Sequence, residues 1–147
     1  MKPHIALAES LEELLLCFPV IQELRTHLSQ DKFLAQVQRQ QQQYGYQIAF
    51  LHIDNSIKSV AGFRLSECLS FGKFLYVDDL ITRADYRSQG YGEMLFDWLI
   101  DYAKAHNCNQ LHLDSGVQRF DAHRFYLKKR MNISGHHFAL DLSTFND

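Results

Sequence analysis

The first third of the chain carries apolar residues at the spacing of amphipathic helices. Ser10, with Glu13 three residues later, forms a capping-box pattern that predicts the start of a helix. Apolar residues then recur at helical spacing, at Leu14, Leu15, Phe18, Ile21 and Leu24. Pro19 lies inside this run and is expected to kink the helix or to divide it into two pieces. A second helix is predicted to begin at Asp31 and to end near Gly45.

The middle of the chain has the composition and alternation of β-strands. Strands are predicted over residues 46–53, 57–65 and 74–82, with Asp54-Asn55-Ser56 as the turn between the first two. Three strands that follow one another through short turns are typical of antiparallel pairing.

The last part alternates between helices and strands. Residues 90–106 show the clearest amphipathic pattern in the chain and predict a long helix. A short strand over 111–114, a helix over 121–130 and a last strand over 138–142 are expected to follow. This order predicts an α/β (α+β) fold in which helices flank a mixed, mostly antiparallel sheet.

The totals narrow the class of protein. A length of 147 residues fits one domain over 1–147, and 46% hydrophobic residues can fill its core. A net charge of -2 with scattered Lys and Arg predicts no nucleic-acid partner. The sequence shows neither an apolar run long enough to span a membrane nor a leader pattern, so no membrane partner is expected. Its three widely spaced cysteines favour reduced thiols in the cytoplasm. The eight histidines show no convincing set of three ligands, so no metal is expected.

The informative segment for chemistry is the hexad Arg87-Ser88-Gln89-Gly90-Tyr91-Gly92, which lies between a predicted strand and the long helix. Glycines permit close approach of the backbone to a ligand, and the first turn of a helix presents free N–H groups at the positive end of its dipole. A pyrophosphate suits such a place. A turn without a ligand is the alternative.

Two other phosphate-binding loops fit the sequence less well. A P-loop requires Gly-x-x-x-x-Gly-Lys-Ser/Thr, which is absent from the chain. A dinucleotide fingerprint requires a third glycine at the position of Leu95.

The chain resembles the GCN5-related N-acetyltransferases (GNAT family). Their Arg/Gln-x-x-Gly-x-Gly/Ala motif is matched by Arg87, Gly90 and Gly92. Their later helix, of the form Asn-x-x-Ala-x-x-Phe/Leu-Tyr, is similar to residues 119–126, where Arg119 stands in the place of Asn and Tyr126 is the final residue.

The resemblance implies that acetyl-CoA is the co-substrate and enters a gap where the strand before the hexad separates from the next strand. The main chain of Leu80, Ile81 and Thr82 would pair with its pantetheine arm, and residues 87–92 would hold the pyrophosphate. Tyr126 stands at the position of the family's general acid, which protonates the departing thiolate. His123 is an alternative source of this proton.

Asp78 and Asp79 are the candidates for the base that takes a proton from the amine, and Asp78 is the preferred one because relatives often carry an acidic residue there. Neighbouring residues on a strand face opposite ways, so only one of the two is expected to face the cleft. An acidic wall that merely attracts a cationic substrate is the alternative to the base.

The resulting hypothesis is an acetyl-CoA-dependent N-acetyltransferase in which a small-molecule or peptide amine attacks directly. No cysteine lies in either motif, which argues against an acetyl-cysteine intermediate. The alternative is a regulatory module that binds CoA without transferring anything. The acceptor is left open by the sequence, and since members of the family are often dimers, a homodimer is among the expectations.

Overall fold

The computed structural model describes residues 2–143, which fall into two compact units, Met1–Leu113 and Asp114–Asp147. The elements of the first unit, in chain order, are β1 (His4–Leu7), α1 (Leu11–Leu24), α2 (Gln30–Tyr44), β2 (Gln47–Ile53), β3 (Ser56–Cys68), β4 (Gly72–Thr82), the 3-10 turn η1 (Ala84–Tyr86), α3 (Tyr91–Ala105) and β5 (Gln110–Leu113). The second unit contains the helix α4 (Phe120–Lys128).

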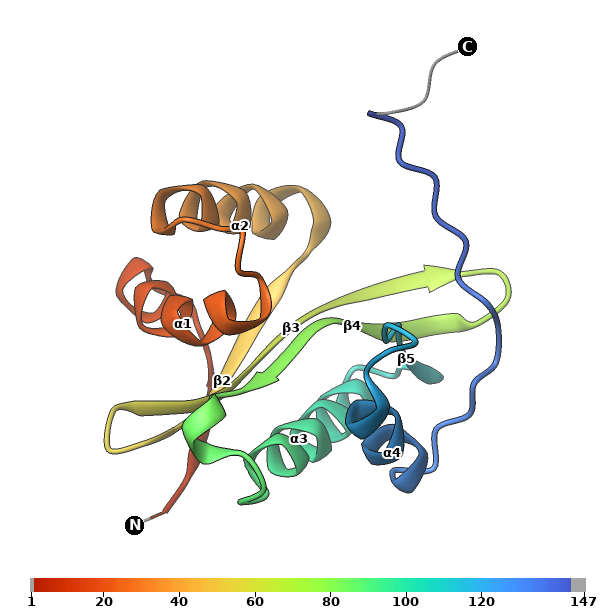
Figure 1. The fold of residues 1–147 in the computed structure, drawn as a ribbon. Helices are drawn as coiled ribbons and strands as arrows, with labels where there is room; N and C mark the ends of the chain where they lie inside the picture. The colour runs from red at the N-terminus through yellow and green to blue at the C-terminus, as the bar shows by residue number, and fades with distance from the viewer. Residues whose placement is uncertain (1, 144–147) are drawn as a thin grey trace. The chain divides into compact units, whose positions relative to one another are not determined.

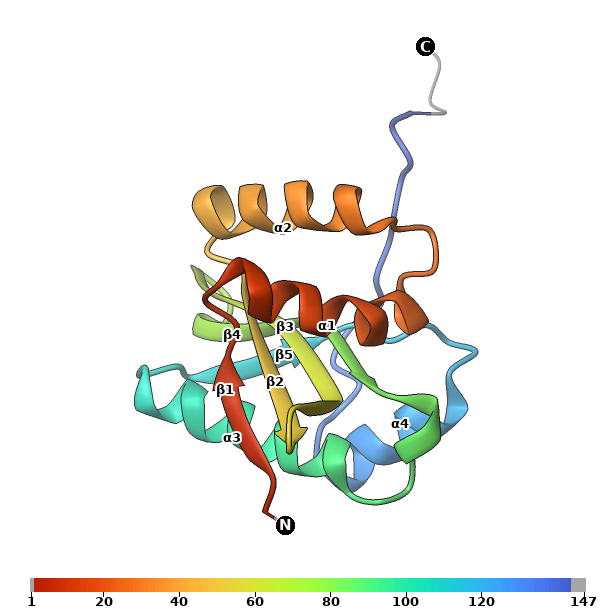
Figure 2. The ribbon, with the colours of Figure 1, turned by 90° about the vertical axis from the view of Figure 1, so that its left-hand side faces the viewer.

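A five-stranded sheet in the order β1-β2-β3-β4-β5 forms the frame of the first unit (Figure 1). The first three pairings are antiparallel, and β4 pairs parallel with β5 after the crossover through α3. Helices α1 and α2 cover one face of the sheet and α3 covers the other, as the turned view makes clear (Figure 2). The predicted mixed, mostly antiparallel sheet is confirmed.

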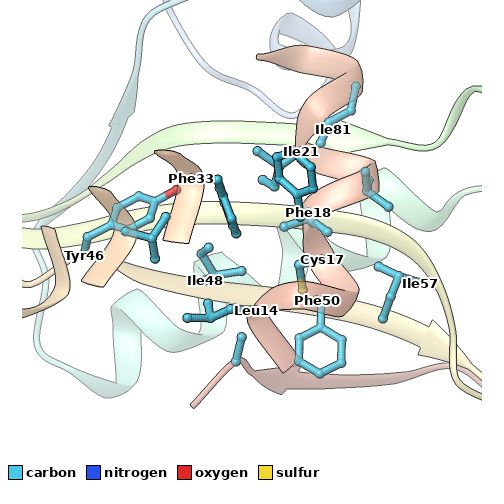
Figure 3. Packing of buried hydrophobic residues seen from close by; sticks show 14 residues of the cluster. Leu14, Cys17, Phe18, Ile21, Phe33, Tyr46, Ile48, Phe50, Ile57 and Ile81 are labelled. Atoms are coloured by element: carbon cyan, nitrogen blue, oxygen red, sulfur yellow. The ribbon is translucent and has the colours of Figure 1, made fainter. Parts of the chain in front are cut away.

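Each face of the sheet has its own apolar core. The core under α1 and α2 contains Phe18, Phe33 and Tyr46 (Figure 3). The core under α3 contains Phe63, Leu75 and residues of α3 such as Leu95 and Leu99. The helical and strand periodicities in the sequence therefore mark the correct buried faces.

Helix α1 begins as its sequence predicts. The Ser10 hydroxyl accepts a hydrogen bond from the Glu13 N–H (3.1 Å), and the Glu13 carboxylate accepts one from the Ser10 N–H (3.1 Å). Pro19 does not divide the helix, which runs unbroken from Leu11 to Leu24. The burial of Val20 and Ile21 directly after the proline shows that packing against the sheet outweighs the lost hydrogen bond.

The sequence analysis missed one strand and predicted one that is absent. Residues His4–Leu7 form β1 against β2, although four residues are too few to show a period. The strand predicted over 138–142 is wrong, because this segment has no regular secondary structure. Its alternating Phe138, Leu140 and Leu142 are exposed, so the alternation has no sheet face to cover within the second unit as described.

A β-bulge in β4 shapes the middle of the sheet. Gly62 of β3 pairs with Asp79, but the next residue, Phe63, pairs with Val77, so that Asp78 is an extra residue on β4. Val77 packs in the core under α3, whereas Asp78 and Asp79 both line a pocket on the α1 and α2 side. The prediction that Asp78 and Asp79, as neighbours on a strand, face opposite ways is therefore wrong.

Candidate active site

The strand β4 has one neighbour along its whole length and a second neighbour along only part of it. It pairs with β3 from Gly72 to Thr82, but with β5 only from Phe74 to Val77. Beyond Val77, no strand among residues 2–113 pairs with the edge of β4 that faces away from β3. The two strands that separate here lie directly before and after α3 in the chain.

The direction of the main-chain groups on this open edge follows from the ladder. The Arg83 N–H donates to the Lys58 carbonyl of β3 (2.9 Å). In an antiparallel ladder such bonds recur at every second residue, so Ile81 faces β3, while the N–H and C=O groups of Leu80 and Thr82 face the open edge. The edge can therefore accept an extended, amide-containing ligand as an additional strand.

The hexad forms the N-terminus of α3. Gly90 is the N-cap with a left-handed φ of 86°, and Ser88 also has a positive φ of 67°. Since the first α-helical bond of α3 runs from the Met94 N–H to the Gly90 carbonyl (3.0 Å), the N–H groups of Tyr91 and Gly92 have no partner within the helix. This geometry is suited to an anion.

The structure brings the hexad and the open strand edge together. A Cβ at Gly92 would lie 3.0 Å from the Thr82 hydroxyl oxygen, which leaves no comfortable room for a side chain. The exposed Arg87 approaches the Thr82 carbonyl, with its Nε 3.5 Å away. A phosphate-bearing ligand with an extended amide arm would fit both features at once.

The turn between β4 and the hexad is held by a buried cation. The ammonium of Lys58, a residue only 9% exposed, lies 3.4 Å from the ring centroid of Tyr86. The Arg83 guanidinium is 5.3 Å from the same ring. These cation–π contacts fix η1 and with it the direction in which the chain enters the hexad.

On the other side of the bulge, Asp79 is the centre of a hydrogen-bond network. The Tyr46 hydroxyl donates to one carboxylate oxygen (2.6 Å), and the Arg25 Nε donates to the other (2.8 Å). Arg25 also donates from Nη2 to the Asp78 carbonyl (3.0 Å). Gly62 makes room for this network, because a Cβ there would overlap the Tyr46 hydroxyl.

Asp78 has a different cation. Both of its carboxylate oxygens accept hydrogen bonds from Arg64, at 2.8 Å from Nε and 3.1 Å from Nη2. The Asp78 side chain is 26% exposed, compared with 14% for Asp79, so Asp78 is the more accessible of the two. Each carboxylate at the bulge is thus neutralised by its own arginine, and together they do not form an uncompensated acidic wall.

Tyr46 is almost fully buried beside these carboxylates. Burial, together with the negative charge of Asp79, raises the pKa of its phenol well above the usual value of about 10. Tyr46 therefore keeps its proton and acts as a permanent donor to Asp79.

The predicted general acid, Tyr126, lies on α4 in the second unit. Burial raises the pKa of its phenol, with a smaller opposing effect from Arg119, so the phenol is protonated over a wider pH range than a free tyrosine. His123 of the same helix has its Nε2 2.8 Å from the Gly116 carbonyl, which it can bond only as a donor. That nitrogen is therefore engaged by the backbone.

Among residues 2–143, no three His, Cys, Asp or Glu side chains are grouped so that they could hold a metal ion. Within the same residues, none of the helices has the length and apolar character needed to cross a membrane.

Comparison with known proteins identifies the family. The model of the acetyltransferase (GNAT) family matches residues 8–131. A curated relative, the "uncharacterized N-acetyltransferase YhdJ" of Bacillus subtilis (strain 168), is 35% identical over 126 residues, which are 86% of this chain and 89% of the relative. The chain therefore belongs to the GNAT family of acetyltransferases and is an acyltransferase by family.

Solved structures show the same fold at low sequence identity. A ribosomal-protein-alanine N-acetyltransferase from Brucella melitensis biovar Abortus 2308 has a TM-score of 0.81 and 18% identity, with 97% of this chain and 100% of that chain covered. The structure of AAC(6')-Iy with a CoA-containing bisubstrate analogue has a TM-score of 0.82 and 11% identity, with 96% and 98% covered.

Sequence analysis missed three residues around the carboxylates, namely Arg25, Tyr46 and Arg64. They lie 14 to 54 positions from the aspartates that they contact, so no local spacing connects them. The one local signal is Gly62 inside a strand pattern, which indicates close approach of another group.

We expect Tyr46→Phe to lower the free energy of unfolding by about 1.5–3 kcal/mol near pH 8, because Asp79 loses a donor to its charged oxygen. Above about pH 10 an unfolded tyrosine ionises while the folded Tyr46 stays protonated, so wild-type stability falls with rising pH. The difference between the two proteins should therefore shrink by about 1.4 kcal/mol per pH unit above pH 10. Urea unfolding between pH 8 and pH 11.5 measures it.

Other groups, such as the buried Cys17 thiol whose pKa is raised to about 12, contribute equally to both proteins and cancel in the difference. A difference that stays constant across the whole pH range would show that Tyr46 has no raised pKa.

Proposed function

We propose that this protein transfers the acetyl group of acetyl-CoA to a primary amine by direct attack, and that its 147 residues act as one N-acetyltransferase domain. The observation that carries the proposal is the open edge of β4 beside the N-terminus of α3. The open strand edge can pair with the amide groups of the pantetheine arm of CoA, and the anion site a few residues further along the chain can bind its pyrophosphate.

The donor would be held mainly by main-chain groups. Leu80 and Thr82 would pair with the pantetheine arm, with Ile81 between them anchored to β3. The hexad Arg87-Ser88-Gln89-Gly90-Tyr91-Gly92 would hold the pyrophosphate. Acetyl-CoA supplies an acetyl group activated as a thioester, and an N–H of β4 that donates to the thioester oxygen would stabilise the charge that develops there by about 2.7–4 kcal/mol. The fold neighbour solved with a CoA-containing analogue supports this assignment.

Two protons must move during the transfer. The amine nitrogen forms a bond to the acetyl carbonyl carbon and loses a proton, while the carbon–sulfur bond breaks and the thiolate gains one. Tyr126 would give the proton to the thiolate, since its raised pKa keeps the phenol protonated at neutral pH.

Asp78 is the residue proposed to take the proton from the amine. Asp79 is less suited to this role, because its side chain is only 14% exposed and is held in the interior by Tyr46 and Arg25. Asp78 is more exposed, and each of its oxygens accepts only one hydrogen bond from Arg64, which leaves a lone pair that can take the proton.

We expect Gly90→Val to weaken CoA binding by at least about 10-fold, because a branched side chain at the N-cap would occupy the place of the phosphate oxygens. Valine is also strained at the positive φ of Gly90. Gly45→Val is the matched control. Gly45 likewise caps a helix with a positive φ of 69° in open space, but at the C-terminal end of α2. Calorimetric titration with CoA and thermal melting of both variants make the comparison.

Similar losses of stability in the two variants, with weak CoA binding only in Gly90→Val, are the expected result. Normal CoA binding by Gly90→Val would mean that the hexad is a turn without a ligand. Tight CoA binding by the wild type without acetylation of any amine would favour a regulatory module.

We expect Tyr126→Phe to lower kcat by about 10²–10⁴-fold, the usual contribution of a positioned proton donor. The KM for acetyl-CoA should change little, because binding depends on the hexad and the β4 backbone. If the high-pH limb of the rate profile reports this phenol, it should disappear in the variant. Phe125→Leu on the same helix is the control for packing. A Tyr126→Phe enzyme within about threefold of wild type would contradict this role and transfer it to water or His123.

A further inference from the structure

A pocket of about 350 Å³ opens between α1, α2 and β4, on the side of the sheet that carries the two aspartates. Its apolar part is formed by Ile21, Phe33 and Val37, which belong to the buried core. Gln36 and Gln40 add neutral polar groups from α2. The size lies within the range of small-molecule sites, at the lower end.

The charges around this pocket cancel. Asp79 is paired with Arg25, and Asp78 is paired with Arg64 through two hydrogen bonds. A polycationic acceptor would therefore find no uncompensated carboxylate here and would have to break an existing ion pair to form a new one. Breaking such a pair would leave an arginine without its counter-charge, which is costly in a partly buried site. This arrangement therefore disfavours polyamines and polyamino sugars as acceptors.

Arg25 is the charged group of the pocket that still has donors to offer. Its Nε donates a hydrogen bond to Asp79, and one N–H of Nη2 donates to the Asp78 carbonyl. The Arg25 side chain is 43% exposed. Within the described residues, its other guanidinium N–H groups make no hydrogen bond. A guanidinium held in place by an ion pair on one side is preorganised to bind a carboxylate on the other.

We propose that the acceptor is an amine that also carries a carboxylate and an apolar group, as in an apolar amino acid, with Arg25 as the residue that binds the carboxylate. The apolar group occupies the part of the pocket lined by Phe33 and Val37. The amine lies toward Asp78, the residue proposed above to take its proton. This inference rests on the proposed N-acetyltransferase function and names its substrate class.

The test uses acceptors that differ only in the carboxylate. Phenylalanine and leucine are compared with phenethylamine and isoamylamine, and spermidine represents the polycations, with release of CoA thiol as the measurement. The wild type should show a kcat/KM for the two amino acids about 10- to 100-fold above that of their decarboxylated partners, the range expected for hydrogen bonds to a charged group.

Arg25→Gln should abolish the preference for the carboxylate, so that phenylalanine and phenethylamine have kcat/KM values within about threefold of each other in this variant, and should raise spermidine relative to phenethylamine, because Asp79 then lacks its cation. The phenethylamine rate in the same variant shows that the site is still folded. Arg39→Gln, on the exposed side of α2 and outside the pocket, is the matched control and should change nothing.

Equal rates with and without the carboxylate, or a preference for spermidine in the wild type, would overturn this inference and leave the proposed acetyl transfer intact. The inferred substrate class would also be wrong if the wild type binds acetyl-CoA but acetylates none of the five amines, and if phenylalanine does not raise its melting temperature. Failure to bind acetyl-CoA at all would refute the proposed function first.

Discussion

The β-bulge at Asp78 is the constraint on which the rest of the site depends. One extra residue on β4, opposite Gly62 and Phe63, turns two consecutive carboxylates to the same face of the sheet. The bulge also lies where β4 loses β5 as a neighbour, directly after Val77. A single irregularity therefore coincides with both the end of the parallel pairing and the wall of the pocket. Bulges of this kind redirect side chains and end pairing at the cost of ladder hydrogen bonds.

The carboxylates that the bulge brings together need compensation, and the sequence provides it from distant elements. Arg25 ends α1, Arg64 lies on β3 and Tyr46 precedes β2. Two adjacent carboxylates, of which one is only 14% exposed, would repel each other without these partners. If the acceptor binds in this pocket, as we propose, the same ion pairs that stabilise the bulge would decide what kind of acceptor it can hold. Under this proposal, stability and specificity are properties of one network.

Most of the fold could be predicted from the sequence because long, periodic elements carry their own signal. The helix that became α3 shows its apolar face in every turn, and the capping box of Ser10 and Glu13 is a local motif that the structure confirms. The hexad could be found for the same reason, since an anion site at a helix N-terminus is built from consecutive residues. The bulge, β1 and the ion pairs of Asp78 and Asp79 could not be predicted, because they depend on register and on contacts between remote segments. The predicted strand over 138–142 failed for the converse reason, as alternation alone supplies no partner.

In the proposed function, the open edge of β4 receives the donor as an additional strand. Amide hydrogen exchange, measured residue by residue by NMR with and without saturating CoA, tests this most directly. The N–H groups of Leu80 and Thr82 are expected to exchange rapidly in the free protein and to become protected on binding, together with those of Tyr91 and Gly92. The N–H of Ile81, which faces β3, should change little. Unchanged exchange at Leu80 and Thr82 in a protein saturated with CoA would show that the donor does not pair with the edge of β4.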